Sequence, residues 1–155
     1  MTHYIDIDKK ELYGRAANET AQNLRALRTQ TAAAQRAEID ALFEDLVLTE
    51  DDYAALDEQM EVIVPNIYQE IRGYSPEYAI NEEAIAFAVE AQDCNAGDRL
   101  HRLLSRTCEH LLLSWWYSLR NAQLAAQYTT SAVSAMSAVK SIVIPTFGTR
   151  RLRMF

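Results

Sequence analysis

Glycine and proline are scarce in this chain, with four glycines and three prolines among 155 residues. An all-β protein of this length needs many tight turns, and those turns draw on both residue types. Their scarcity therefore favours long helices joined by few connections. Because 49% of the residues are hydrophobic, the chain is expected to form one domain with a substantial core.

The clearest helical pattern follows Thr49, which is well placed to cap a helix whose first turn contains three acidic residues. Hydrophobic residues then recur at helical spacing: Tyr53, Leu56, Met60, Ile63, Val64, Ile67, Tyr68 and Ile71. Pro65 lies within this pattern, and we expect it to kink the helix or remove one hydrogen bond. Gly73 marks the expected end of this helix.

Two earlier helical segments are expected before Thr49. Asp8 has the position of an N-cap, with Glu11 three residues later, as in a capping box. Good helix formers continue to about Thr31. A second, amphipathic segment covers residues 36–48. We expect a helical hairpin with a break near residues 31–36; the alternative is that the alanines in this stretch carry one helix straight through.

The second half of the chain is dominated by one predicted long helix, from Asp98 to about Lys140. Its first half carries an apolar stripe: Leu100, Leu103, Leu104, Thr107, Leu111, Leu112 and Trp115. After Arg120 the composition changes to small residues, which predicts close packing against another helix. Before this helix, residues 84–89 read equally well as a short strand or as a turn of helix.

The last fifteen residues, SIVIPTFGTRRLRMF, do not follow the helical pattern. They begin with β-forming residues, contain Pro145 and Gly148, and end with three arginines. Such a segment either extends from the domain toward a partner, where it could add a strand to a sheet edge, or folds back as a strand or flap. The predicted organisation is an all-α domain, residues 1–140, with an extended C-terminal docking tail, residues 141–155. The domain is expected to be a bundle of three to four main helices that includes a long C-terminal helix.

Charge is distributed unevenly along the sequence. Residues 1–98 contain 21 acidic and 7 basic residues, whereas residues 99–155 contain one acidic residue, Glu109, and eight basic ones. One interpretation is an acidic surface that is simply solvated. The other is a dipolar subunit whose basic end meets the acidic end of a neighbouring copy, as in head-to-tail association.

No catalytic signature is found in the sequence. It has no nucleophile elbow, phosphate-binding loop, zinc-protease motif or dinucleotide fingerprint. His101, Cys108 and His110 have the wrong spacing for a zinc site. We therefore expect neither enzymatic activity nor a cofactor or metal. No segment has the length and hydrophobicity of a membrane span, so no membrane association is expected.

Nucleic-acid binding is a weaker alternative. Arg99, Arg102 and Arg106 form a basic group, but they belong to a helix that is expected to be mostly buried. A net charge of −7 also disfavours general binding to phosphates.

Three adjacent aromatic residues, Trp115, Trp116 and Tyr117, raise the question of what surrounds the long helix. At about 100° per residue, their side chains fan across more than half of its circumference. Either the helix is covered by protein on several sides, or one of these rings faces a partner.

The segment LHRLLSRTCEHLLLSWWYSLRNAQ resembles the third-helix signature of the head–tail connector (adaptor) proteins of tailed bacteriophages. The residues that carry the resemblance are Leu111, Leu112, Leu113, Trp116, Tyr117 and Arg120. The earlier segment TEDDYAALDEQMEVIVPNIYQEI is similar to an early helix of that family, which also opens on acidic residues. The resemblance covers about half of the chain, from Thr49 to Arg120 with a gap.

The resemblance implies a structural virion protein located in the neck between head and tail, and in the host cytoplasm during assembly. Subunits of such proteins form a homo-oligomeric ring, expected to match the portal symmetry, that contacts the portal protein and neck or tail-completion proteins. DNA passes through the ring without specific binding. The roles of connector, stopper and tail-completion protein remain open at this point.

The resemblance also suggests two groups of functional residues. Four residues are expected at the subunit interface: Trp115, Trp116, Tyr117 and Arg120. The residues expected to dock on the portal belong to the tail: Ile142, Val143, Ile144, Pro145, Phe147, Arg150, Arg151 and Arg153. Two alternative functions stay open: a small acidic helical module that binds another protein as a regulator or inhibitor, and a DNA-binding regulator.

Overall fold

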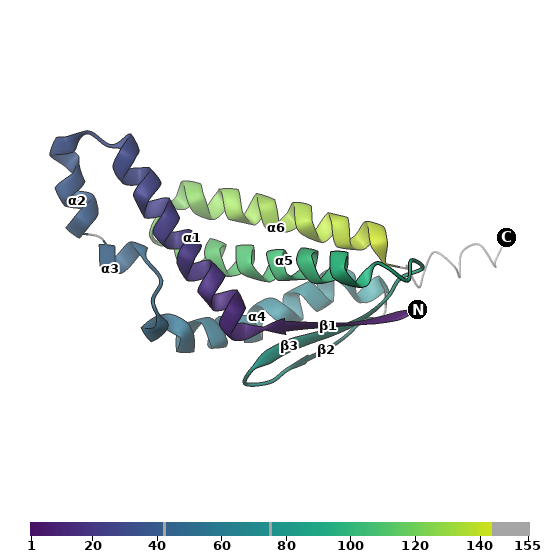
Figure 1. Ribbon diagram of the computed structural model, residues 1–155. Coiled ribbons are helices and arrows are strands. Elements are labelled where there is room, and N and C mark those ends of the chain that lie inside the picture. The colour runs from purple at the N-terminus through teal and green to yellow at the C-terminus, as the bar shows by residue number, and fades with distance from the viewer. Residues whose placement is uncertain (42, 75, 144–155) are drawn as a thin grey trace.

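The computed structural model describes residues 1–41, 43–74 and 76–143, in which helices pack on one face of a small sheet (Figure 1). The side chains of residues 34, 39, 43 and 44 are not described. The elements in chain order are β1 (Thr2–Asp8), α1 (Lys9–Gln30), α2 (Arg36–Ala41), α3 (Phe43–Leu46), α4 (Tyr53–Ile71), β2 (Glu77–Ile80), β3 (Ala84–Glu90), α5 (Gly97–Tyr117) and α6 (Ala122–Ile142). Short 3₁₀ turns occupy Ala33–Gln35, Glu50–Asp52 and Arg72–Tyr74.

The antiparallel sheet has the strand order β1-β3-β2. Ile5 of β1 and Tyr78 of β2 lie opposite Phe87 of β3. Alternate residues of β1 and β3 are buried against the helices, and the residues between them face outward. The prediction of an all-α fold is therefore wrong in this respect: the described chain is mainly helical but contains a three-stranded sheet. Residues 84–89, for which the sequence allowed two interpretations, form a strand.

Two separate helices, α5 and α6, replace the predicted long helix from Asp98 to Lys140. They are joined by a tight turn at residues 118–121 and run side by side in opposite directions (Figure 1). Asn121 has an extended backbone conformation, and its side chain accepts a hydrogen bond from the Leu124 N–H at 3.1 Å. Asn121 is therefore the N-cap at which α6 starts. Leu119, at the tip of the turn, is 96% exposed.

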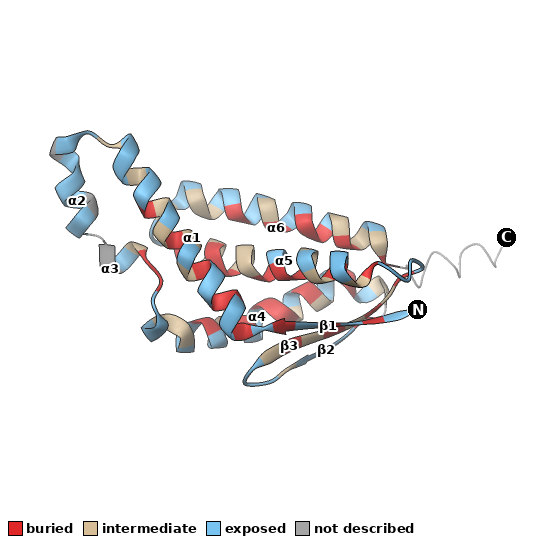
Figure 2. Cartoon of the chain, viewed as in Figure 1, coloured by how far each residue is buried: buried red, intermediate tan, exposed pale blue. Residues whose placement is uncertain are grey.

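The core lies between the sheet and α1, α4, α5 and α6 (Figure 2). The hydrophobic stripe predicted on α4 is confirmed by its buried residues: Leu56, Met60, Ile63, Val64, Ile67 and Ile71. Pro65 lies inside α4 without ending it. At the start of α4, the Thr49 N–H donates to the Asp52 carboxylate at 3.0 Å, as expected for a capping sequence.

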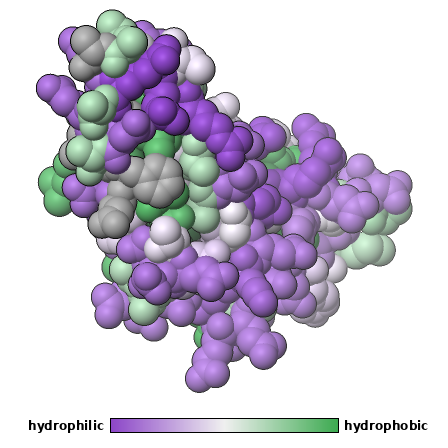
Figure 3. All heavy atoms as spheres, turned by 60° about the vertical axis from the view of Figure 1, so that its left-hand side comes forward, coloured by the Kyte–Doolittle hydropathy of each residue, from purple (hydrophilic) through white to green (hydrophobic). Residues whose placement is uncertain are grey.

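The end of α1 forms an arm together with α2 and α3. This arm, defined here as residues 25–46, projects beyond the bundle and is largely exposed (Figure 2). The expected break is confirmed, because α1 ends at Gln30 and α2 begins at Arg36. Residues 36–48 do not form one continuous helix, since Val47 and Leu48 leave the helical path and enter the core. Figure 3, viewed from the side of the arm, shows hydrophilic residues over most of this face, with hydrophobic residues in a recess beside the arm.

Helix α6 continues past Lys140, the predicted end of the domain. Helix α6 continues through Ile142, and Val143 forms an isolated antiparallel bridge with Ala91, just beyond β3. Val143 is only 4% exposed and belongs to the hydrophobic core. Ile142 and Val143, which the prediction placed in the docking tail, therefore pack on the domain itself. The predicted docking residues from Ile144 to Arg153 lie outside the described residues.

Candidate interaction surfaces

Trp116 and Arg120 connect the end of the arm to the turn between α5 and α6 through hydrogen bonds to backbone carbonyls. The buried Trp116 donates from Nε1 to the Leu46 carbonyl at 3.1 Å. Arg120 lies over the Trp116 ring, with Cζ 3.7 Å from the ring centroid. Its Nε donates to the Asp45 carbonyl at 2.6 Å and its Nη1 to the Trp116 carbonyl at 2.7 Å. Both side chains therefore make extensive contacts within the subunit.

Tyr117 belongs to a polar network at the junction of α1, α5 and α6. Its ring stacks on that of Tyr128, with centroids 5.8 Å apart and an interplanar angle of 6°. The Asn23 side-chain amide donates to the hydroxyl of Tyr117 at 3.2 Å and to that of Tyr128 at 2.7 Å. The Tyr128 hydroxyl in turn donates to Glu19 at 2.9 Å. Burial raises the pKa of both tyrosines, which stay protonated donors at neutral pH.

The surroundings of α5 explain why three aromatic residues can be adjacent on one helix. Trp116 faces residues 45–46, Tyr117 faces α1 and α6, and Trp115 is half-buried beside Trp116. Helix α5 is thus covered on several sides by its own chain. Of the four residues predicted at a subunit interface, Trp116 and Tyr117 are buried within the subunit. Trp115 and Arg120 retain exposed surface.

His110 extends the polar network along α5. Its Nδ1 lies 2.7 Å from the Ser131 hydroxyl, and its ring meets the Tyr128 ring edge-on with centroids 5.3 Å apart. Burial lowers the pKa of His110, so the imidazole is neutral at pH 7. The neighbouring Glu109 has a raised pKa, again through burial, and forms an ion pair with Arg15 at 3.6 Å.

A second polar cluster, partly buried, joins the start of α1 to α4. The largely buried Lys9 forms an ion pair with Asp57 at 3.2 Å, and the Tyr13 hydroxyl donates to the same carboxylate. Burial, followed by the contact with Asp57, raises the pKa of Tyr13. The cluster thus links the start of α1 to α4 through polar contacts.

The structure bears on two of the predicted absences, those of a metal site and of a membrane span. Among residues 1–41, 43–74 and 76–143, no three His, Cys, Asp or Glu side chains are grouped so that they could hold a metal ion. His101 Nε2 lies 2.9 Å from the Asp6 carbonyl oxygen, and Cys108 is fully buried. Among the described residues, no helix is long and apolar enough to cross a membrane.

The outer face of α6 is uncharged along most of its length. Lys140 is the single charged residue in this 21-residue helix. The exposed positions carry small or neutral side chains: Ala122, Gln123, Ala126, Gln127, Thr129, Thr130, Val133, Ser134, Ser137 and Ser141. The Thr129 and Thr130 hydroxyls donate back to the carbonyls of Ala125 and Ala126, which leaves less of their polar character toward solvent. We call this set the neutral face of α6.

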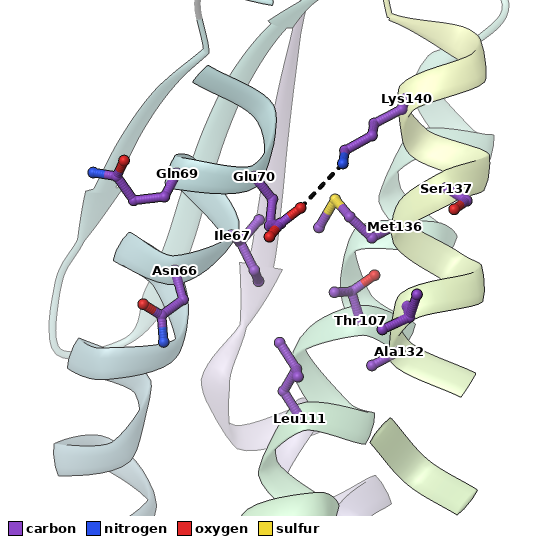
Figure 4. Close-up of a pocket in the computed structure, with 11 residues that line it drawn as sticks. Asn66, Ile67, Gln69, Glu70, Thr107, Leu111, Ala132, Met136, Ser137 and Lys140 are labelled. Carbon is purple, nitrogen blue, oxygen red and sulfur yellow. Dashed lines mark hydrogen bonds and ion pairs between the residues drawn. The ribbon is translucent and has the colours of Figure 1, made fainter. Parts of the chain in front are cut away.

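A groove of about 500 Å³ separates α4 from α6, with α5 beneath it. Ile67, Leu111 and Met136 point into it (Figure 4). Near one end, Lys140 of α6 reaches Glu70 of α4 across the groove, at 3.0 Å. The groove was not anticipated from the sequence, because its walls come from three helices whose packing is a tertiary property.

Three arginines of α5, Arg99, Arg102 and Arg106, are all exposed, contrary to the expectation of a mostly buried helix. Their spacing of three and four residues places them on one side of α5. None of them forms an ion pair with an acidic residue in the part of the chain that the structure describes. We call this group the arginine stripe.

Comparison of the chain with protein-family models, curated proteins and solved structures finds no match. The resemblance of α5 to connector proteins therefore stays a prediction, and function is inferred from the residues and surfaces described above.

Proposed function

We propose that this protein is a head–tail connector (adaptor) subunit of a tailed bacteriophage that assembles into a homo-oligomeric ring on the portal protein. The observation that carries the proposal is the neutral face of α6. A solvated helix usually presents many charges, whereas this one presents none between Ala122 and Val139. The cores of protein interfaces are depleted in charged residues in the same way.

The neutral face of α6 is suited to burial against a like subunit. Its alanine and serine side chains lose little conformational entropy on burial. No charge on it has to be stripped of water, which would be costly without a partner. Small side chains also allow the backbone of a neighbouring helix to come close. These properties support a helix-on-helix contact between adjacent subunits.

The charge distribution supports head-to-tail rather than face-to-face association. The arginine stripe occupies α5, while α4 contains four acidic residues and no lysine or arginine. Two of these, Asp57 and Glu70, form ion pairs with lysines of the same chain. The other two, Glu58 and Glu61, are exposed and form no ion pair among the described residues. A ring needs two different, complementary faces on each subunit. Opposite charges on the two faces would steer subunits together and fix their orientation.

The tail keeps its proposed docking role, with six of the eight predicted residues retained. Ile144, Pro145, Phe147, Arg150, Arg151 and Arg153 stay the proposed portal-binding residues. Val143 is buried in its own core and serves to anchor the root of the tail, and Ile142 is the last residue of α6. The further partners are neck or tail-completion proteins, and DNA would pass through the ring without specific binding. The proposed location is the virion neck.

Negative-stain electron microscopy of the purified protein at high concentration tests the ring. The proposal predicts closed particles with a central channel and one dominant rotational symmetry. Open filaments, two-fold dimers or particles of monomer size alone would contradict it.

A second function is favoured by the arginine stripe, because three exposed arginines without a described acidic partner can contact phosphates. In this alternative, the protein is a DNA-binding regulator. It predicts retardation of a duplex DNA fragment at low salt that is lost in an Arg102→Glu variant and declines steeply as salt rises. Equal mobility of the DNA with and without the protein at low salt would exclude this function.

A further inference from the structure

Apolar side chains form the floor and one edge of the groove between α4 and α6. In the floor, Ile67 and Met136 are largely covered and Leu111 is half-buried, whereas Val133 at the edge is 61% exposed. Its polar rim is mostly uncharged, with Asn66, Gln69 and Ser137 around the opening (Figure 4). Such a hollow suits a short stretch of chain with one or two large apolar side chains and no charge.

The root of the C-terminal tail lies close to this groove. Val143 is fixed by its burial and by its bridge to Ala91, one helical turn beyond Lys140 at the groove end. Met136 lies about 10 Å back along α6 from Val143, at 1.5 Å per residue. Four extended residues span at most about 13 Å. Phe147 can therefore reach the part of the groove beside Met136 if the chain reverses direction after Val143.

The chemistry of the tail matches the groove. Residues 144–149, IPTFGT, contain isoleucine, proline and phenylalanine but no charged side chain. Arg150, Arg151 and Arg153 follow, and they would continue beyond the apolar part. On the α4 side the groove is lined by Asn66, Ile67, Gln69 and Glu70. Because α4 contains no lysine or arginine, this wall does not repel the arginines that follow residue 149. The Glu70–Lys140 ion pair is partly exposed, and such pairs are weak enough to open for an entering chain.

We propose that the groove between α4 and α6 binds residues 144–147 of the same chain in the free subunit, with Phe147 in the recess beside Met136. The groove shields the apolar part of the tail from solvent. The connector function adds a consequence that rests on it: the tail would leave the groove when the portal offers a better site, so the groove competes with docking.

Photo-crosslinking tests this inference directly. The exposed Val133 is replaced by p-benzoylphenylalanine, the protein is irradiated at low concentration, and tryptic peptides are analysed by mass spectrometry. We expect a crosslink to the peptide of residues 141–150, and at least a fivefold lower yield when Phe147→Ala is added. The same photoreactive residue at Tyr4, which is 82% exposed on the outer sheet face, is the control and is expected to give no such crosslink.

An equal mixture of ¹⁵N-labelled and unlabelled protein distinguishes the possible occupants. Crosslinked peptide pairs of uniform isotope content support binding by the same chain. Pairs that combine labelled and unlabelled peptides would assign the groove to the tail of a second copy and overturn the inference, as would the absence of a tail crosslink at residue 133. Because the readout is made on the free subunit, it is independent of whether rings form.

Discussion

The guanidinium of Arg120 lies over the indole of Trp116, 3.7 Å from Cζ to the ring centroid. The same guanidinium donates to the carbonyls of Asp45 and Trp116. Arginine suits this position because its planar group can stack and still donate several hydrogen bonds, which a lysine ammonium cannot do. One side chain thus joins the α5–α6 turn, the aromatic residues of α5 and the end of the arm.

Replacing Arg120 tests how much this contact stabilises the fold. Arg120→Ala is expected to lower the free energy of unfolding by about 1–2 kcal/mol, because it removes the stacking and two hydrogen bonds. Arg120→Lys is expected to restore less than half of that loss. Urea denaturation gives both values. Leu119→Ala, at the exposed tip of the same turn, is the control and should stay within about 0.5 kcal/mol of wild type. Equal stability of Arg120→Ala and Leu119→Ala would contradict this account.

The polar network around Tyr128 gives a second stability prediction. Tyr128→Phe keeps the stacking on Tyr117 but removes the hydroxyl that donates to Glu19 and accepts from Asn23. We expect a loss of about 1–2 kcal/mol in the free energy of unfolding, since partly buried polar groups lose their partner. Thermal denaturation monitored by circular dichroism measures the change. The exposed Gln127→Ala is the neighbouring control, and a Tyr128→Phe protein as stable as that control would show that the network is not needed.

The burial of His110 predicts a pH dependence of stability. Burial lowers its pKa below the usual value of 6.5; nearby Arg106 acts in the same direction and Glu19 opposes it. Between 6.5 and the lower folded pKa, the unfolded chain binds more protons than the folded one. The free energy of unfolding therefore falls as pH falls through this window, and the contribution of His110 is fully present above it.

The pH prediction is checked by measuring the urea midpoint at pH 7.5 and pH 5.5. The fall between the two values should be smaller in His110→Gln, which can still contact Ser131 but does not titrate. Glu109, whose raised pKa gives a slope of opposite sign, is present in both proteins. An equal fall of the urea midpoint in the wild type and in His110→Gln would mean that other titrating groups produce the pH dependence.

The two cysteines are predicted to differ sharply in reactivity. Cys94 is exposed, whereas Cys108 is buried and burial raises its pKa to about 12. The reactive form of a thiol is the thiolate, so Cys108 should be inert in the folded protein. A chromogenic disulfide reagent at pH 8 is expected to titrate one thiol per chain rapidly and two in guanidinium chloride. Two rapidly reacting thiols in the native wild type would refute the burial of Cys108. One rapidly reacting thiol in the native Cys94→Ser variant would refute it as well.

Elements set by local pattern could be predicted from the sequence. Helix α4 follows from its apolar spacing and from the acidic residues after Thr49, and the break after Gln30 falls where it is expected from the sequence, within residues 31–36. Strand β1 was missed, although THYIDID alternates apolar and polar residues. Its partner β3 is about eighty residues away, and only that pairing distinguishes a strand here from an irregular N-terminal segment.

Features that depend on packing were not predictable in the same way. The turn at Asn121 interrupts a stretch of good helix formers, and the antiparallel packing of α6 on α5 stabilises the interruption. The sequence indicated that Trp116 and Arg120 matter but not that they would contact Asp45 and Leu46, because no local rule relates residues seventy positions apart. The groove between α4 and α6 could not be predicted from the sequence either, because its walls come from helices that are distant in the chain.

Sedimentation velocity over a range of protein concentrations tests the central claim, assembly through the neutral face of α6. The wild type is compared with an Ala126→Glu, Thr130→Glu variant, which places two charges on that face. An Asn18→Glu, Gln22→Glu variant adds the same charges at exposed positions of α1. The account predicts one large, discrete species for the wild type and the α1 variant, and only the 17.6 kDa monomer for the α6 variant. A monomeric wild type at every concentration, or an α6 variant that assembles like the wild type, would contradict it.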